Sequence, residues 1–244
     1  MVLSEGEQRV IAIASFFAEL AVSDHTGAAV FDDPVSSLDH LRRQRVARRL
    51  VKEAKTRQVI VFTHDSVFLA ELSNALQELG VASLFQHLTY SQLNAGVVNA
   101  GLPWHHEGYR GRLDALSKLA RAFARGERAM DNVEAERVSR DIYGKLRQVI
   151  ERVVEDVVLC SVLKRYDDYV RVPKIREVVG LTVEECNPLI ELYVAASDIL
   201  DAHDKASARQ FAAPTAADVL RDIGALEAAI TAIQDRRKPV KAAA

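Results

Sequence analysis

The sequence predicts an α/β segment with a short, mostly parallel sheet, followed by an all-α domain, in a chain that is rich in helix overall. Two short apolar runs, at residues 28–31 and 59–62, predict buried strands. Helical periods precede, separate and follow these runs, which is the alternation typical of parallel α/β sheets. Beyond residue 111 the strand pattern fades and helical periods dominate. We therefore expect a first domain at residues 1–108 and a helical domain at residues 109–244.

The first domain is expected to begin with a buried helix whose apolar residues cover more than one face. A basic helix then connects the two strands, and a third helix ends at Gly80, a residue suited to helix termination. Two edge strands close the domain. The expected ranges, in chain order, are helix 8–22, strand 28–31, helix 41–54, strand 59–62, helix 67–79, and strands 84–90 and 96–99.

The helical domain is punctuated by proline and glycine between its apolar periods. Thr215 followed by Asp218 predicts an N-terminal cap for the last helix. The expected helices cover residues 111–126, 133–163, 183–203 and 215–236.

Composition excludes several classes of protein. The 244 residues include 32 basic and 34 acidic side chains, so the chain is not a polybasic nucleic-acid module. No apolar run approaches the roughly 20 residues that a membrane span needs. The two cysteines lack metal-binding spacing, which favours a reducing, cytoplasmic location over a disulfide framework.

Two adjacent acids, Asp32 and Asp33, follow the first predicted strand. In open α/β sheets, ligands collect at the carboxyl ends of the strands. Asp32 is suited to hold Mg²⁺, which prefers hard oxygen ligands, and Asp33 to orient or deprotonate an attacking water. Taken alone, the pair could also be capping aspartates at a strand end.

The segment Leu3-Ser4-Glu5-Gly6-Glu7-Gln8 precedes an apolar helix. Ser4 and the Gly6 backbone would lie at the helix N-terminus, where free N–H groups and the helix dipole favour a phosphate. The same residues also fit a capping box, with Ser4 as N-cap and Glu7 three residues later. The two interpretations are compatible.

His64 follows the second predicted strand, Val59–Phe62, after Thr63. A neutral imidazole at this place can reach a γ-phosphate and an attacking water. A single histidine after a strand is more often structural. Because His64 occurs together with the two acids, a functional role is favoured here.

In this order, these residues resemble the ABC ATPase family, particularly its SMC-like branch, over residues 3–66. Leu3 to Glu7 is similar to the ABC signature, Asp32-Asp33 to the Walker B pair, Ser36 to Asp39 to the D-loop, and His64 to the switch histidine. The family usually has glutamate where this chain has Asp33. The shorter side chain is expected to affect the rate of ATP hydrolysis more than the catalytic role of this residue. The resemblance implies ATP and Mg²⁺ as cofactors, Asp33 and His64 as catalytic residues, Asp32 as metal ligand, and a nucleotide-binding set of Ser4, Glu5, Gly6, Glu7, Ser37 and Asp39.

No Gly-x-x-x-x-Gly-Lys-Ser/Thr phosphate loop occurs in the chain. In ABC-type enzymes the nucleotide is sandwiched between one subunit's phosphate loop and the other's signature. The resemblance therefore implies that this chain is the C-terminal lobe of an ATPase domain that lacks Walker A. It needs an N-terminal Walker A lobe and a head-to-tail partner, such as a second copy in a homodimer. Alone it is expected not to hydrolyse ATP.

Five arginines crowd residues 42–49, and Arg42, Arg45 and Arg49 share one helix face. Such a face could contact phosphates of DNA or RNA. The alternative, which we favour, is a solvated face whose arginines pair with acids elsewhere in the chain.

In the helical domain, Arg147 and Glu151 share a face at i, i+4, and physics alone predicts a routine ion pair. With the downstream His203, they resemble the RNase triad of bacterial anticodon nucleases of the PrrC and RloC type, which join an SMC-like ABC ATPase to a helical nuclease domain. The resemblance implies that Glu151 and His203 share the proton transfers and that Arg147 contacts the phosphate of tRNA.

The expected function is thus an SMC-like ABC ATPase lobe that gates a helical effector, implied by the resemblance to be a tRNA anticodon nuclease in bacterial defence against phage. Two alternatives stay open. One is a DNA-associated SMC-like ATPase in repair or defence. The other is a non-enzymatic interaction module whose ATPase motifs form only a dimerisation surface.

Overall fold

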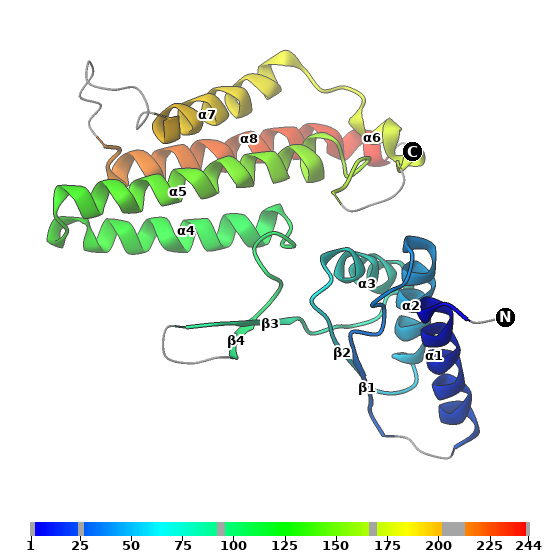
Figure 1. Cartoon of the computed structure of the whole chain (residues 1–244). Coiled ribbons are helices and arrows are strands. Elements are labelled where there is room, and N and C mark those ends of the chain that lie inside the picture. Colours follow the sequence, from blue (N-terminus) through cyan, green and yellow to red (C-terminus); the bar gives the residue numbers. More distant parts are fainter. Residues whose placement is uncertain (1–2, 24–26, 92–95, 166–169, 202–212, 243–244) are drawn as a thin grey trace. The chain divides into compact units, whose positions relative to one another are not determined.

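The computed structural model describes residues 3–23, 27–91, 96–165, 170–201 and 213–242 (Figure 1). The chain divides into two compact units, residues 1–106 and 107–244. The first unit is α/β and the second is helical, so the predicted fold class is confirmed.

The first unit contains three helices and two separate two-stranded sheets among its described residues. Strands β1 and β2 pair in parallel, in a register from Ala29 opposite Val59 to Asp32 opposite Phe62. Strands β3 and β4 form an antiparallel hairpin. The elements are α1 (Glu5–Val22), β1 (Ala29–Asp32), α2 (His40–Glu53), β2 (Val59–Phe62), α3 (Ser66–Leu79), β3 (Gln86–Thr89) and β4 (Val97–Ala100).

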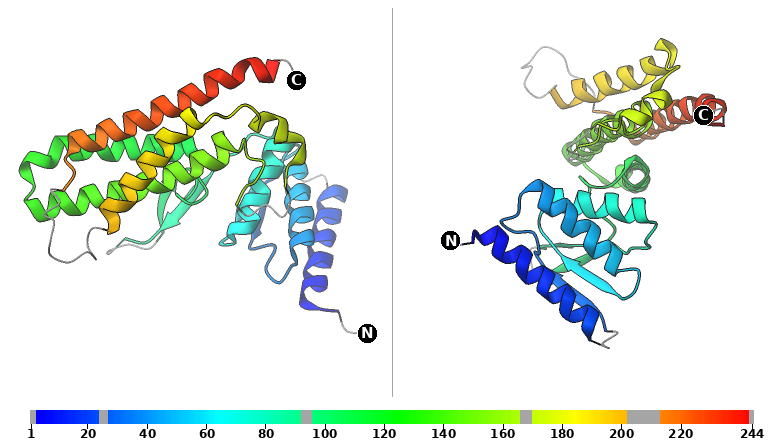
Figure 2. Two further views of the ribbon diagram at one scale, coloured as in Figure 1. Left: turned by 90° about the horizontal axis from the view of Figure 1, so that it is seen from above. Right: turned by 90° about the vertical axis from the view of Figure 1, so that its right-hand side faces the viewer.

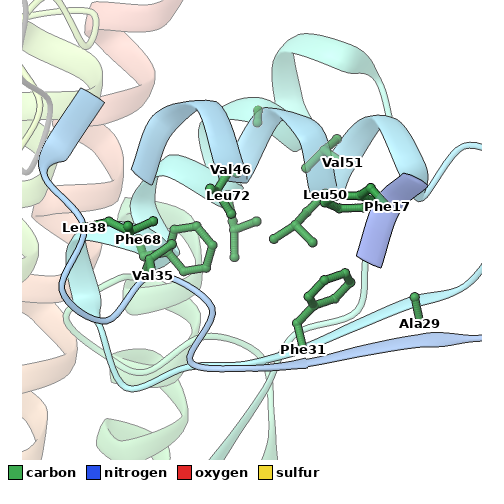
Figure 3. Packing of buried hydrophobic residues seen from close by; sticks show 12 residues of the cluster. Phe17, Ala29, Phe31, Val35, Leu38, Val46, Leu50, Val51, Phe68 and Leu72 are labelled. Carbon is green, nitrogen blue, oxygen red and sulfur yellow. The ribbon is translucent and has the colours of Figure 1, made fainter. Parts of the chain in front are cut away.

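One face of the β1–β2 sheet packs against the helices (Figure 3). Ala29 and Phe31 point from β1 into a core completed by Phe17 of α1 and by apolar side chains of α2 and α3. The helix that follows each strand begins at an aspartate cap, Asp39 for α2 and Asp65 for α3. These caps set where the chain turns back over the sheet. The remaining core members are Val35, Leu38, Val46, Ala47, Leu50, Val51, Phe68, Leu72 and Ala75.

The opposite face of this sheet is exposed, which differs from the prediction that both strands are buried. Val30, Ile60 and Phe62 are 54%, 37% and 53% exposed. Parallel sheets normally have both faces covered, and the described residues supply helices for only one. The apolar residues of the two strands are typical of a sheet covered on both faces, but the described residues cover only one face.

Helix α1 is likewise less buried than its sequence predicts. Only Gly6 and Phe17 are buried along its length, and Ile11 and Phe16 are exposed. The prediction of a helix buried on more than one face was wrong for the described chain, because α1 packs through one face only.

The second unit is a helical bundle in which α5 (Asn132–Val153) packs against three other long helices, α4 (Tyr109–Gly126), α7 (Val183–Asp201) and α8 (Ala216–Ala242). Helices α4, α5 and α8 lie alongside one another in all views (Figure 2). The short elements are 3₁₀ turns at Glu127–Ala129 and Val172–Lys174 and a single helical turn, α6 (Ile175–Val178). Within the described parts of the chain, no helix combines the length and apolar character needed to cross a membrane.

Helix α5 ends earlier than predicted. The expected helix 133–163 stops as an α-helix at Val153, passes through a π-helical turn at Val154–Val158, and gives way to residues with positive φ at Cys160 and Ser161. The buried Arg237 of α8 secures this end. Its guanidinium donates to the carbonyl of Val158 at 3.0 Å, to that of Val157, and to the Cys160 sulfur at 3.0 Å.

Candidate active site

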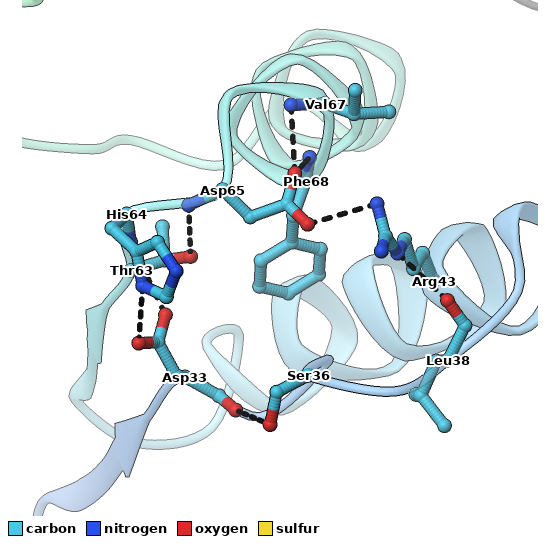
Figure 4. A network of polar contacts seen from close by, with 9 residues as sticks. All are labelled: Asp33, Ser36, Leu38, Arg43, Thr63, His64, Asp65, Val67 and Phe68. Atoms are coloured by element: carbon cyan, nitrogen blue, oxygen red, sulfur yellow. Dashed lines mark hydrogen bonds and ion pairs between the residues drawn. The ribbon is translucent and has the colours of Figure 1, made fainter. Parts of the chain in front are cut away.

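Asp33 and His64 meet at the carboxyl ends of the paired strands β1 and β2 (Figure 4). The Nδ1 atom of His64 lies 2.5 Å from Oδ2 of Asp33, and the His64 backbone N–H donates to Oδ1 at 3.1 Å. The imidazole is otherwise exposed, and the carboxylate is half-buried. The parallel register brings the two residues together because Asp33 directly follows the last residue of β1 and His64 lies two residues after the last residue of β2.

The main chain of Asp33 adopts an unusual conformation, with a φ of 40°. Its N–H continues the sheet by donating to the carbonyl of Phe62 at 2.9 Å. Desolvation opposes ionisation of this carboxyl, but hydrogen bonds from the backbone and ring of His64 and from the side chain of Thr63 outweigh it and lower the Asp33 pKa. The carboxylate is thus held ionised and accepts from His64.

Asp32, the last residue of β1, is exposed and lines an open groove of about 560 Å³ between β1 and α1. An exposed carboxylate at a strand's carboxyl end supplies the hard oxygen donors that Mg²⁺ prefers. Asp32 therefore fits a metal-ligand role by its chemistry and position. The other lining residues are Glu5, Gln8, Arg9, Ala12, Ile13, Phe16, Val30, Phe31 and Pro34.

The N-terminus of α1 carries the capping box that the sequence predicts. The Ser4 hydroxyl accepts from the Glu7 N–H at 3.3 Å, while the Glu7 carboxylate accepts from the Ser4 N–H at 2.9 Å and from its hydroxyl at 2.8 Å. These bonds, the backbone one first, lower the pKa of Glu7. Glu5 lies exposed beside them.

Gly6 of α1 packs directly on the loop after β1. A Cβ atom at this position would stand 2.7 Å from the carbonyl oxygen of Ser37, closer than real Cβ contacts. Ser37 itself has a φ of 67°, and Asp39 ends the loop by accepting from the Arg42 N–H at 2.9 Å, the bond that most lowers the Asp39 pKa. The signature-like and D-loop-like segments are therefore neighbours within one chain.

Three contacts of the site did not follow from the sequence. Arg9 of α1 donates to the carbonyl of Asp33 at 2.8 Å. Arg43 pairs with Asp65 at 2.8 Å, which joins the starts of α2 and α3 (Figure 4). The side chain of Thr63 forms a hydrogen bond with Asp33, and its position directly before His64 was a signal that could have been used.

The arginine-rich face of α2 is largely engaged by the chain's own acids. Arg42 pairs with Asp39 at 3.3 Å, and Arg49 pairs with Glu53 at 2.8 Å while its guanidinium lies 4.1 Å from the centre of the Phe17 ring. Arg45 is exposed and has no ion pair among the residues that the structure describes. The remaining two arginines of the helix also pair with carboxylates, Arg43 with Asp65 and Arg48 with Glu78.

Of the suggested RNase triad, Arg147 and Glu151 form the i, i+4 ion pair that the sequence predicts, although a long one. Nε of Arg147 lies 3.9 Å from Glu151, at the limit of an ion pair, and forms no hydrogen bond there. Glu151 instead accepts from Arg165 at 3.0 Å. The third member, His203, lies outside the described residues.

Comparison with known proteins finds a family match for most of the first unit. Residues 1–93 match a protein-family model described as an AAA domain. The match spans Ser4 to Glu7, the two acids Asp32 and Asp33 at the end of β1, and His64, and it ends before the helical unit. No curated protein and no solved structure matches the chain. Residues 1–93 are therefore similar to an AAA-type ATPase domain, from a family of P-loop ATPases.

Proposed function

We propose that this chain supplies the water-activating half of an ABC-type ATPase site, completed by a phosphate-loop lobe, and that the ATPase gates the helical unit. The observation that carries the proposal is the contact between Asp33 and His64 at the ends of two parallel strands. Acid and imidazole at this edge are where an α/β sheet places ligand-handling groups.

In the proposed site, Asp33 orients the attacking water and accepts its proton. Its lowered pKa keeps the carboxylate ionised, so that it can accept a hydrogen bond from the water. His64 holds that carboxylate through Nδ1, which leaves Nε2 free of this bond to contact the γ-phosphate or the water. The roles are complementary because each residue orients the other.

Asp32 is the proposed ligand of the magnesium ion, from its exposed place beside Asp33. When bound, Mg²⁺ would neutralise charge that develops on the phosphate oxygens. The protein would present the Asp32 carboxylate to the ion, and the Asp33 carboxylate would remain available to the attacking water.

The start of α1 and the neighbouring loop form the proposed second nucleotide surface. Ser4 and Gly6 present the N-terminus of a helix, and Ser37 and Asp39 lie on the loop packed against it. A helix N-terminus favours a phosphate. In a head-to-tail homodimer, this surface would close over the nucleotide held by the partner's phosphate loop, so the isolated chain is expected to be inactive.

The test is ATP hydrolysis by this chain with a Walker A lobe supplied on the same or a second polypeptide. Asp33→Asn and His64→Ala are expected to lower kcat by about 100-fold or more, as the loss of a general base does. Glu78→Gln, on the far end of α3, is the control. Hydrolysis at the wild-type rate by Asp33→Asn would reject the proposal and favour an interaction module.

A ribonuclease role of the helical unit is the second candidate function. The observation that favours it is Arg147, whose side chain is 38% exposed and is not drawn into a close pair with Glu151. A guanidinium in this state is suited to a phosphate oxygen. Together with Glu151 and His203, it would cleave tRNA in a nucleotide-gated response to phage.

Cleavage of total bacterial tRNA by the complete, ATP-hydrolysing protein tests this second role. Discrete cuts are expected from the wild type and not from Arg147→Ala or His203→Ala. Arg140→Ala, which removes another arginine of α5 paired with Glu136, is the matched control. Intact tRNA under these conditions would reject the nuclease and favour the DNA-associated ATPase.

A further inference from the structure

Arg9 joins helix α1 to the loop that carries the candidate base. Its Nη1 atom donates to the carbonyl oxygen of Asp33 at 2.8 Å across 24 positions of sequence. Its side chain is half-buried and forms no ion pair among the described residues. The same side chain lines the groove that also contains Asp32. The hydrogen bond to Asp33 is thus the principal polar contact of this cation in the described chain.

The contact acts on a residue whose conformation needs support. Asp33 has a φ of 40°, in the left-handed region that side chains other than glycine rarely adopt. Its N–H is held by Phe62 at 2.9 Å, and its carboxylate by His64. Arg9 holds the one remaining polar group, the carbonyl. Ser36 reaches the same oxygen only at 3.4 Å, through both its N–H and its hydroxyl.

We infer that Arg9 is a positioning residue, which fixes the Asp33 main chain so that the carboxylate stays against His64. The inference rests on the proposed function, in which Asp33 acts on water. Removing the guanidinium leaves the carbonyl with only the two 3.4 Å contacts from Ser36, and lets the main chain of Asp33 rotate out of the left-handed region. The carboxylate then loses its fixed distance to the imidazole.

The position of Arg9 in α1 gives the contact a second consequence. Gly6, one helical turn before it, rests on the Ser37 carbonyl, so α1 touches the loop at both ends of the segment Asp33–Ser37. A ligand drawn to the start of α1 therefore acts on Asp33 through a single rigid helix turn. The start of α1, proposed to contact the nucleotide held by the partner, is linked in this way to Asp33, which is proposed to act on the chain's own nucleotide.

A spectroscopic experiment on the full chain tests the positioning directly. The Asp33 carboxylate fixes the tautomer of His64 through Nδ1, and long-range ¹H–¹⁵N correlations report that tautomer. Arg9→Met keeps the apolar stem and deletes the donor, and it is expected to shift the His64 ring signals at constant pH. Arg57→Met is the control, because Arg57 pairs with Glu53 at 2.8 Å and donates to the carbonyl of Leu20 in α1 at 3.3 Å, so its contacts are away from Asp33. His64 signals that are unchanged in Arg9→Met, or changed equally in both variants, would overturn the inference.

The kinetic arm uses the ATPase completed with its Walker A lobe. Arg9→Met is expected to lower kcat by about 10- to 100-fold, the cost of a misplaced catalytic group, while KM for ATP changes by less than about twofold. Arg57→Met should retain the wild-type kcat per folded protein. If Asp33→Asn is inactive while Arg9→Met is fully active, the positioning role fails and the proposed function stands. If Asp33→Asn is itself active, the proposed function fails.

Discussion

Gly6 and Ser37 approach each other so closely that the position of Gly6 has no room for a side chain. A Cβ atom there would come within 2.7 Å of the Ser37 carbonyl oxygen, which is backbone and cannot swing aside. The glycine is required by this packing, whatever ligand the helix N-terminus binds. Two motifs that are separated by 30 residues in the sequence are thereby fitted to each other.

Gly6→Ala is expected to destabilise the first unit by about 1–3 kcal/mol, the usual cost of overpacking a close contact. Gly224→Ala is the control, because a Cβ atom at Gly224 in α8 meets no atom within 4 Å. That substitution should stabilise the helical unit by about 0.5–1 kcal/mol through helix propensity. Denaturant unfolding of both variants checks the prediction, and equal stability of Gly6→Ala and wild type would contradict it.

Tyr143→Phe is expected to lower the free energy of unfolding by about 1–2 kcal/mol. Tyr143 of α5 is buried and donates to Asp222 of α8 at 2.6 Å. The variant leaves the Asp222 carboxylate with Arg221, at 3.0 Å, as its partner. Thermal or denaturant unfolding at neutral pH measures the loss.

The same tyrosine makes stability depend on pH in the alkaline range. Burial, and then the hydrogen bond to Asp222, raises the pKa of Tyr143 well above its ordinary value. The stabilisation is therefore complete below about pH 10, the ordinary tyrosine pKa, and is lost as pH rises toward the folded-state value. Between these limits the difference in stability between wild type and Tyr143→Phe should shrink. A difference that stays constant up to the alkaline limit would show that Tyr143 does not titrate in this way.

Arg237→Met is expected to destabilise the helical unit by about 2–4 kcal/mol. The substitution leaves the carbonyls of Val157 and Val158 without the donors that now satisfy them, and buried unpaired carbonyls are costly. Its neighbour Arg236 offers a matched control, because its own side chain is exposed and pairs with Glu185 at 3.2 Å. Arg236→Met should cost no more than about 1 kcal/mol. Similar losses in the two variants would refute the anchoring role of Arg237.

Charge reversal on the α2 face tests its suggested binding to nucleic acid. Because Arg42 pairs with Asp39, and Arg45 is the arginine of α2 for which the described residues supply no ion pair, few charges of this face are free for phosphates. We expect Arg42→Glu with Arg45→Glu to leave the salt dependence of duplex DNA binding unchanged. A decrease of about two in the slope of log affinity against log salt would instead identify both side chains as phosphate contacts.

The elements that could be predicted from sequence are those with local causes. Strand β2 matches its predicted range, since four consecutive β-branched or aromatic residues mark it. The end of α3 at Gly80 follows from the left-handed conformation that glycine adopts there, with a φ of 64°. The Ser4–Glu7 capping box needs only four residues of sequence.

The end of α5 could not be predicted, because its cause lies about 80 residues away. The apolar period of α5 continues through Val157 and Val158, so the local pattern favours a longer helix. The π-helical turn is held by Arg237, which belongs to α8. In the candidate site, the meeting of Asp33 and His64 follows from parallel strand pairing, whereas the reach of Arg9 depends on how α1 lies against β1.

The exposed side of the β1–β2 sheet has a consequence for the lifetime of this polypeptide in a cell. Exposed apolar strands are the feature that chaperones and proteases use to recognise unfinished proteins. A chain that displays Val30, Ile60 and Phe62 in this way should be removed quickly unless a partner covers them. Protein turnover would then keep the supply of this chain matched to that of its partner.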